Sequence, residues 1–288
     1  MRIAKCIITF IIIGVLLILL LAPIAIMFTN SFMSFKEIDY NYVNKEKQLF
    51  AQSPYASDYF VKMDALPNTF SFSQYIALAG NPFYFHYLFN SIKLLIPIVL
   101  LNLTFSLLAA YGLTQISRKV SNPLLLALAV TMLLPLQAII VPHYMVASFL
   151  RLSPYLSIVL PAVFNPLGQI ILFQFCRAIP SELIEAAKID GAGHIKILLQ
   201  IIIPLMKNGI ITLVVLLSVE YWNIIDQAVV FIDSVYDQPL SVYLAQIARD
   251  NMRVIFASSV VFMLPMLLIY NSFKENFSQG IQMSSGIK

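Results

Sequence analysis

Few residues of this 288-residue chain have the types and the spacing that catalysis or metal binding requires. The histidines His86, His143 and His194 do not have the spacing of zinc ligands, and Cys6 and Cys176 form neither a CxxC pair nor a disulfide framework. No nucleophile stands with a base, and neither an HExxH motif nor a GxxxxGK[ST] loop occurs. We therefore expect no catalytic residue, no metal site and no cofactor bound by this chain.

The clearest pattern lies in a polar segment between two apolar ones, at 177–208. Pro180 and the serine after it predict the start of a helix, with acidic residues in the first turns where the helix dipole favours them. Gly191 is expected to end this helix, because glycine adopts the left-handed conformation of a helix C-terminus without strain. A second amphipathic helix is expected over 194–203, ending at Pro204. Small side chains at the turn would let it dock against another surface; helices that only rest on lipid headgroups are the alternative.

A second candidate group lies in the apolar segment at 209–231, which carries Glu220 near its middle. A carboxylate at mid-bilayer costs about 2.5–3.5 kcal/mol on insertion scales, so this side chain is expected to face protein or water. With Asn223 and Gln227 it forms an i, i+3, i+7 pattern on one helix face. We hypothesise that this face lines a path for a polar solute. A hydrogen bond between helices is an equally good explanation.

The elements that position these groups are strongly apolar. The chain is 60% hydrophobic and 11% charged, with a mean hydropathy of +0.85, whereas soluble domains carry about 25% charged residues. Charge-free intervals that are long enough to cross a bilayer include 6–35, 94–117, 120–150 and 254–273. We predict an all-α polytopic membrane protein with six transmembrane helices, at 7–29, 87–116, 123–149, 155–175, 209–231 and 254–273.

Basic residues indicate the orientation of these spans. With both termini in the cytoplasm, the inner face carries Arg2, Lys5, Arg118, Lys119, Arg177, Lys188, Lys196, Lys207, Lys274 and Lys288, and the short outer loops carry Arg151, Arg249 and Arg253. This places an external loop at 30–86, the polar segment at 177–208 inside, and a cytoplasmic tail at 274–288. The net charge is +4, but the sequence has no dense run of basic residues with interleaved aromatic residues. No nucleic-acid partner is therefore expected.

The polar segment resembles the EAA motif of binding-protein-dependent ABC importers, in which EAA is followed after three residues by glycine and after nine more by I-x-L-P. The matching residues, with isoleucine replacing the motif's leucine at 203, are Glu185, Ala186, Ala187, Gly191, Ile201, Ile203 and Pro204. The longer form EAAxIDGA, typical of the carbohydrate-uptake branch, runs from Glu185 to Ala192 and includes Asp190. Further matches to MalG-type permeases include Pro67-Asn68-Thr69-Phe70, Ala109-Ala110-Tyr111-Gly112 and Trp222-Asn223. The chain departs from the family in its longer first loop, at 41–63, and in having Asp226 rather than an acid directly after Asn223.

The resemblance implies a single transmembrane permease domain, 1–288, with the MalG-like fold of a type I ABC importer in a bacterial plasma membrane. It implies a MalF-like second permease, two cytoplasmic ATPase subunits that bind ATP and Mg²⁺, and an extracellular or periplasmic solute-binding protein. The EAA residues, Glu185, Ala186, Ala187, Asp190, Gly191, Ala192, Ile201 and Pro204, would then couple transport to the ATPases. Glu220, Trp222, Asn223, Asp226 and Gln227 are candidates for a sugar path, with Trp222 either stacking on a sugar ring or anchoring its helix.

Other functions are weighed against this one. An ion-coupled secondary transporter acting alone would use Glu220 as a relay, but it predicts internal repeats that the sequence does not show. A membrane-embedded enzyme would need a catalytic constellation that is not present. Within the ABC class, a polyol or glycerol phosphate remains an alternative cargo to a carbohydrate.

Overall fold

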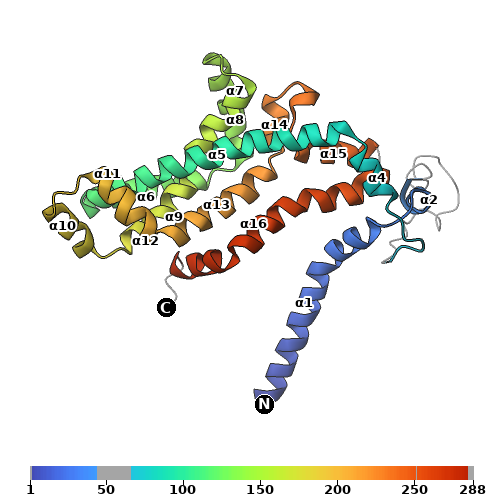
Figure 1. The fold of residues 1–288 in the computed structure, drawn as a ribbon, viewed down its shortest axis with the longest axis horizontal. Coiled ribbons are helices and arrows are strands. Elements are labelled where there is room, and N and C mark those ends of the chain that lie inside the picture. The colour runs from blue at the N-terminus through green and yellow to red at the C-terminus, as the bar shows by residue number, and fades with distance from the viewer. Residues whose placement is uncertain (1, 44–65, 251, 285–288) are drawn as a thin grey trace. The chain divides into compact units, whose positions relative to one another are not determined.

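The structure, a computed structural model of the chain, describes residues 2–43, 66–250 and 252–284. These residues form helices and short connections, with one isolated bridge between Met33 and Phe70. The predicted all-α fold is confirmed for the part of the chain described (Figure 1).

The first half of the chain contains α1 (Arg2–Asn30), α2 (Phe35–Ile38), the π-helical turn η1 (Asp39–Val43), α4 (Ser73–Ala79), α5 (Pro82–Gln115), α6 (Arg118–Met132) and α7 (Leu136–Phe149). The second half contains α8 (Pro154–Val163), α9 (Pro166–Arg177), α10 (Ser181–Ile189), α11 (His194–Ile197), the π-helical η3 (Leu198–Ile202), α12 (Ile203–Leu205) and α13 (Lys207–Trp222). It ends with α14 (Asp226–Phe231), η4 (Val235–Asp237), α15 (Leu240–Asp250), η5 (Met252–Val254) and α16 (Ile255–Ser284).

Between four and six segments of the described chain are long and apolar enough to span a membrane. Four are helical throughout or nearly so, at Thr9–Asn30, Pro82–Gln115, Pro154–Arg177 and Met252–Ser278. Two more are pairs of helices with a sharp bend, α6 with α7 at 98° and the α11–α12 stretch with α13 at 77°. The chain is therefore a multi-pass membrane protein by length and composition.

Three predicted spans are not the continuous helices that the sequence suggests, and the one at 155–175 is interrupted only between Val163 and Pro166. The span expected at 123–149 breaks between Met132 and Leu136, where Pro135 provides the N-cap of α7. The span expected at 209–231 ends at Trp222 and resumes at Asp226 as the short helix α14. Apolar composition alone does not reveal these breaks, because the residues on both sides are equally hydrophobic.

The segments predicted to be an external loop and a cytoplasmic tail contain helices. Segment 30–86, the predicted external loop, contains α2, η1 and α4, and its last residues belong to α5. Most of the extended stretch at 41–63 lies outside the described residues. The helix α16 continues to Ser284, so it occupies most of the predicted tail 274–288, of which 285–288 lie outside the described residues.

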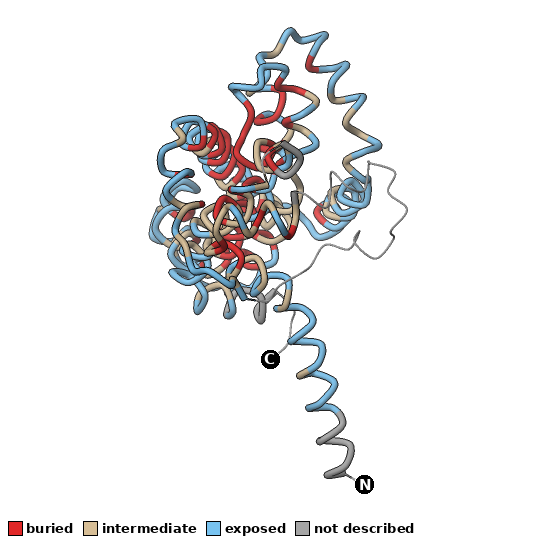
Figure 2. The backbone as a smooth tube through the Cα atoms, turned by 90° about the vertical axis from the view of Figure 1, so that its right-hand side faces the viewer, coloured by how far each residue is buried: buried red, intermediate tan, exposed pale blue. Residues whose placement is uncertain are grey.

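The chain forms two compact units, of which the first comprises residues 1–86 and 243–265. In this unit the buried Gln74 donates two hydrogen bonds from Nε2 to the carbonyl oxygens of Asn30, at 2.7 Å, and Met33, at 3.0 Å. Its Oε1 accepts from the backbone N–H of Ala257 at 3.2 Å, so one amide ties α1 and α4 to α16. The apolar part of α1 itself is not buried at all within the chain (Figure 2).

The second unit comprises residues 87–242 and 266–288 and has α9 at its centre, packed against α6 and α13. Two glycines allow close approach, Gly209 between α13 and α9 and Gly168 between α9 and α5. A Cβ on Gly209 would overlap the ring of Phe175, and a Cβ on Gly168 would overlap the side chains of Asn102 and Ser106. Small residues that let helix backbones approach are typical of packing in membranes, where apolar burial provides no driving force between helices.

Candidate coupling loop and central cavity

The turn after α10 has the geometry that its glycine predicts. Gly191 has a φ of 77°, in the left-handed region. Its N–H donates to the carbonyl oxygen of Lys188 at 3.1 Å, and the N–H of Ala192 donates to that of Ala187 at 2.9 Å. These two bonds are the pair that defines a Schellman motif. The prediction that α10 ends at this glycine is confirmed.

The helix after the turn extends further than predicted. It begins at His194, becomes π-helical over Leu198–Ile202, and continues to Leu205 before the chain bends at Met206. Pro204 has no N–H to donate to the preceding turn, and the change to π-helical hydrogen bonding falls in that turn. The helix therefore ends at Leu205, one residue beyond the expected end at Pro204.

Two kinds of contact hold this helix against the rest of the second unit. On one face its side chains are buried, at Ile197, Leu198, Ile202 and Met206. Near its start, Nδ1 of His194 and the hydroxyl of Tyr111 on α5 form a hydrogen bond of 2.9 Å. The second helix is thus fixed to the bundle, whereas α10 has no buried residue.

The segment Ser181–Leu205 presents apolar side chains that nothing in the described chain covers. Leu183, Ile189, Ile195 and Leu199 are exposed, with Ile189 at 86% and Ile195 at 75%. Among the predicted coupling residues, Glu185, Ala186, Asp190, Gly191 and Pro204 are exposed, and Ala187, Ala192 and Ile201 are half-buried. In Figure 1 α10 lies at one end of the second unit, beside α6, α9 and α11. Such an outlying turn with an apolar surface is suited to contact another protein.

A cavity of about 690 Å³ lies within the second unit, where three helix breaks meet. Its lining includes residues beside the break between α6 and α7, the residues between α8 and α9, and the C-terminal end of α13. Irregular backbone at membrane depth is tolerated where it lines a cavity or is buried in protein. A smaller adjoining cavity of about 350 Å³ is lined by residues of the α13–α14 break.

The structure places the predicted path residues differently from a single helix face. Because α13 ends at Trp222, Glu220, Asn223 and Gln227 do not form the continuous i, i+3, i+7 surface that was expected. Glu220, Asn223, Asp226 and Gln227 nevertheless all line the smaller cavity, and Glu220 and Gln227 also line the larger one. Trp222 is 98% buried and lines neither cavity, so its predicted stacking on a solute is not supported by its position.

Glu220 has features of both predicted roles, a hydrogen bond between helices and a position at the cavity. Its Oε1 accepts from Nδ2 of Asn165 at 3.2 Å, which joins α13 to the residue between α8 and α9. Asn165 also donates to the hydroxyl of Tyr221 at 3.1 Å and caps α9 by accepting from the N–H of Leu167. Glu220 thus makes a hydrogen bond between helices while its side chain remains exposed to the cavity.

The other polar groups at the cavities have fewer bonds. Asn223 donates to the carbonyl oxygen of Val219 within its own helix at 2.8 Å. Asp226 accepts from Nε2 of Gln137 on α7 at 3.4 Å. Oε1 of Gln227 is buried and has no hydrogen-bond partner among the residues described.

Two residues of this site, Asn165 and Tyr221, are not among those predicted from the sequence. A signal for Asn165 was present, because Asn followed by Pro166 is the N-cap and first-turn pattern that begins a helix. A helix start inside an apolar segment indicates a broken span. Tyr221 had no such signal, because a tyrosine in an apolar helix occurs equally in a core.

Comparison with known proteins identifies the family. The family described as "Binding-protein-dependent transport system inner membrane component" matches residues 102–283. The chain belongs to this family. This permease is therefore a component of an ABC transport system and an integral membrane protein of a bacterial plasma membrane.

The permease resembles proteins named for sugar transport. It is 27% identical over 233 residues to the arabinooligosaccharides transport system permease protein AraQ of Bacillus subtilis, covering 79% of this chain and 83% of that one. It is 29% identical over 252 residues to the melibiose/raffinose/stachyose import permease protein MelC of the same organism, covering 85% and 89%. A relative from Yersinia enterocolitica, the sn-glycerol-3-phosphate transport system permease protein UgpE, is 31% identical over 137 residues, 47% of this chain and 49% of that one.

The fold also matches a solved structure. A chain in the crystal structure of a bacterial ABC transporter involved in the import of the acidic polysaccharide alginate superposes with a TM-score of 0.77. The match covers 96% of the permease and 97% of that chain at 22% sequence identity. At this identity the likeness shows the fold, which is that of an ABC importer permease.

Proposed function

We propose that this permease is one half of the translocation pore of an ATP-driven importer for a sugar or oligosaccharide. In this proposal it has six spans with both termini in the cytoplasm. It pairs with a different, MalF-like permease, two ATPase subunits bind below, and a solute-binding protein delivers the cargo from outside. The permease itself is non-catalytic, and ATP and Mg²⁺ bind only to the ATPases.

The observation that carries the proposal is the geometry of the turn after α10. A Schellman turn at Gly191 joins two short helices, and exposed apolar side chains on both sides of it have no partner within the described chain. This surface would be covered by docking into a groove of a cytoplasmic ATPase. Because the helix after the turn is fixed to the bundle through His194 and its buried face, movement of that ATPase would be transmitted to the spans.

The composition of the central cavity supports an uncharged cargo. Among the described residues, its lining includes Glu220 and His143 but no lysine or arginine, and the adjoining cavity adds Asp226. Acids and amides bond well to the hydroxyl groups of a sugar, whereas a phosphate would require basic partners. This favours the carbohydrate over glycerol phosphate, although one relative is named for the latter.

Replacement of Gly191 tests the coupling role. We expect Gly191→Trp to leave the permease inserted and assembled but to separate ATP hydrolysis from uptake, because a bulky side chain holds the groove away and the left-handed conformation is strained. Gly191→Asn is the matched control, since asparagine adopts that conformation readily. Uptake by membrane vesicles and ATPase activity are measured on the same preparations. Equal uptake by Gly191→Trp and wild type would contradict the coupling role.

Affinity purification from native membranes tests the assembly. Mass spectrometry should recover one different permease and two ATPase copies for each copy of this chain. Recovery of this chain alone, active in uptake driven by an ion gradient, would replace the proposal by the secondary-transporter alternative.

A further inference from the structure

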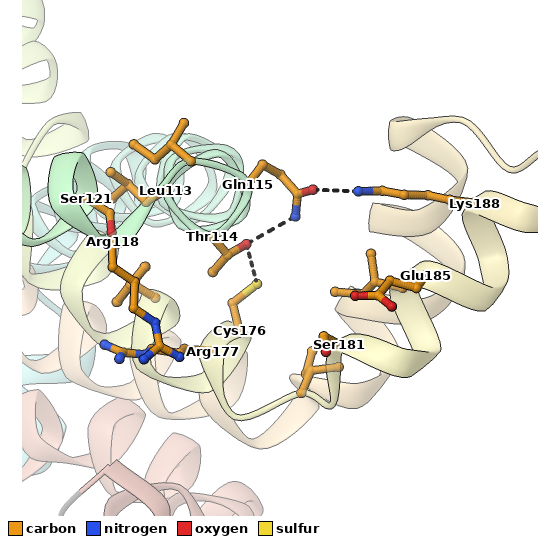
Figure 3. Close-up of a pocket in the computed structure, with 14 residues that line it drawn as sticks. Leu113, Thr114, Gln115, Arg118, Ser121, Cys176, Arg177, Ser181, Glu185 and Lys188 are labelled. Carbon is orange, nitrogen blue, oxygen red and sulfur yellow. Dashed lines mark hydrogen bonds between the residues drawn. The ribbon is translucent and has the colours of Figure 1, made fainter.

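A separate cavity of about 380 Å³ lies beneath α10 in the second unit (Figure 3). It is bounded by the end of α5, the start of α6, the end of α9 and the inner face of α10. It has no lining residue in common with the central cavity. The transport path proposed above therefore gives it no role.

The charged side chains that line this cavity are mainly basic. Arg118, Arg177 and Lys188 line it, and Glu185 is the acidic residue among its lining. Figure 3 labels Arg118 and Arg177 among the side chains that line this cavity. Within the part of the chain described, neither arginine forms an ion pair, whereas Lys188 donates to Oε1 of Gln115 at 3.1 Å. Positive charges that line one cavity favour the binding of an anion there.

The first residues of two helices also line this cavity. The helix α6 begins at Arg118 and α10 begins at Ser181, and neither has a side-chain cap on its first N–H groups. Ser121 in the first turn of α6 and Ser181 line the cavity. Uncapped N–H groups and the positive end of the helix dipole both favour an anion. The helix N-termini therefore favour the same kind of ligand as the basic side chains do.

The position of the cavity favours a phosphate group close to the membrane. It lies where the span α5 ends and α6 begins, and the adjacent Ile116 and Val120 are exposed apolar side chains. Arginine binds phosphate oxygens in a bidentate manner, and basic pockets between transmembrane helices on the cytoplasmic side bind anionic headgroups. The volume exceeds that of a phosphate group, which leaves space for the polar remainder of a headgroup.

We propose that the cavity between α5, α6, α9 and α10 binds a phosphate-bearing anion, held by Arg118, Arg177 and the two helix N-termini. An anionic phospholipid and a free phosphate compound share this chemistry. Either ligand would fix α10 against the ends of α5 and α6, because Lys188 and Glu185 of α10 line the same cavity. The site depends on the fold of the second unit and not on the transported cargo.

Binding to the purified complex, washed free of lipid in mild detergent, tests the proposal. Dioctanoyl phosphatidylglycerol is titrated and followed by native mass spectrometry, with dioctanoyl phosphatidylcholine as the neutral-headgroup comparison. We expect Arg118→Gln/Arg177→Gln to weaken phosphatidylglycerol binding at least tenfold. The double variant Lys119→Gln/Lys207→Gln removes two equivalent charges from exposed positions outside the cavity and should bind like wild type.

Two further measurements identify the source of the phosphate and distinguish loss of binding from misfolding. Displacement of the lipid by millimolar inorganic phosphate would assign the site to a free phosphate compound, and retention of the lipid would assign it to phosphatidylglycerol. Arg118→Lys/Arg177→Lys keeps the charge without the bidentate geometry and should lose only part of the affinity, with an unchanged gel-filtration profile. Equal phosphatidylglycerol affinity in the glutamine variant and wild type, or equal binding of phosphatidylcholine and phosphatidylglycerol by wild type, would overturn the proposal. Neither result depends on uptake, so the site and the proposed transport function fail separately.

Discussion

The bond between Asn165 and Glu220 predicts a specific response to a change of one atom. In Asn165→Asp the amide nitrogen becomes an oxygen, so the cap on α9 is retained while the donor to Glu220 and Tyr221 is lost. Two carboxylates then face each other across the 3.2 Å that the hydrogen bond now spans. With an effective dielectric constant between about 20 and 80, the repulsion at this distance is roughly 1–5 kcal/mol.

The lower part of that range is expected, because the Glu220 side chain is exposed to the cavity and one of the two carboxylates can take up a proton. A loss of about 1–2 kcal/mol corresponds to a fall of roughly 2–8 °C in the thermal midpoint for a chain of this size. The assay is the thermal midpoint of the detergent-solubilised complex, measured by loss of the gel-filtration peak after heating.

A second substitution separates this explanation from general damage to the site. Glu220→Gln in the Asn165→Asp background removes the repulsion and provides an amide donor for the new carboxylate, so the double variant should recover most of the lost stability. Glu220→Gln alone should cost little, since two amides can still bond. Strictly additive effects of the two substitutions would refute a direct interaction between these side chains.

Three further predictions concern packing and polar groups in the second unit. Gly209→Ala should destabilise the permease by about 1–3 kcal/mol through overlap with Phe175, whereas Gly112→Ala, with no atom near its new Cβ, should not; equal thermal midpoints would contradict this. Asn102→Leu should lower the free energy of unfolding by about 1–3 kcal/mol, because the carbonyl groups of Ala162 and Val163 lose their buried donor. An unchanged thermal midpoint would show that water replaces this donor. Gln227→Leu should preserve stability, since Oε1 has no partner among the described residues to lose, but should reduce uptake if this residue lines the path; unchanged uptake would remove it from the path.

The sequence predicted the parts of the fold that local physics determines. Gly191 ended its helix because a left-handed residue favours glycine wherever it occurs, and four predicted spans appear as helices because a long charge-free segment has no better structure in lipid. The breaks after Met132 and Trp222 were missed, because they depend on neighbours that the hydropathy of the segment does not report. Prolines were a partial guide: Pro135 and Pro166 stand at breaks.

Contacts between distant parts of the chain also explain why the candidate site was only partly predicted. Glu220 was identified because a carboxylate in an apolar segment requires a compensating environment, but its partner Asn165 lies 55 residues earlier and only the fold brings the two together. The helix-face pattern failed for a related reason, since it assumed that α13 continues beyond Trp222. In place of that helix face, the structure has a cavity lined by the helix breaks. The periodicity of side chains along a continuous helix does not predict such breaks.

The hydrogen bonds of Asn102 restrict bending at the break between α8 and α9. Its Nδ2 lies 2.9 Å from the carbonyl oxygen of Ala162, 3.2 Å from that of Val163 and 3.4 Å from that of Asn165. A break within a span allows its two halves to bend relative to each other. Here one side chain of α5 bonds to the last two residues of α8 and to Asn165, the N-cap of α9. We therefore expect α8 and α9 to move together, so that a displacement at the Arg177 end of α9, which leads into α10, is transmitted to the start of α8 at Pro154.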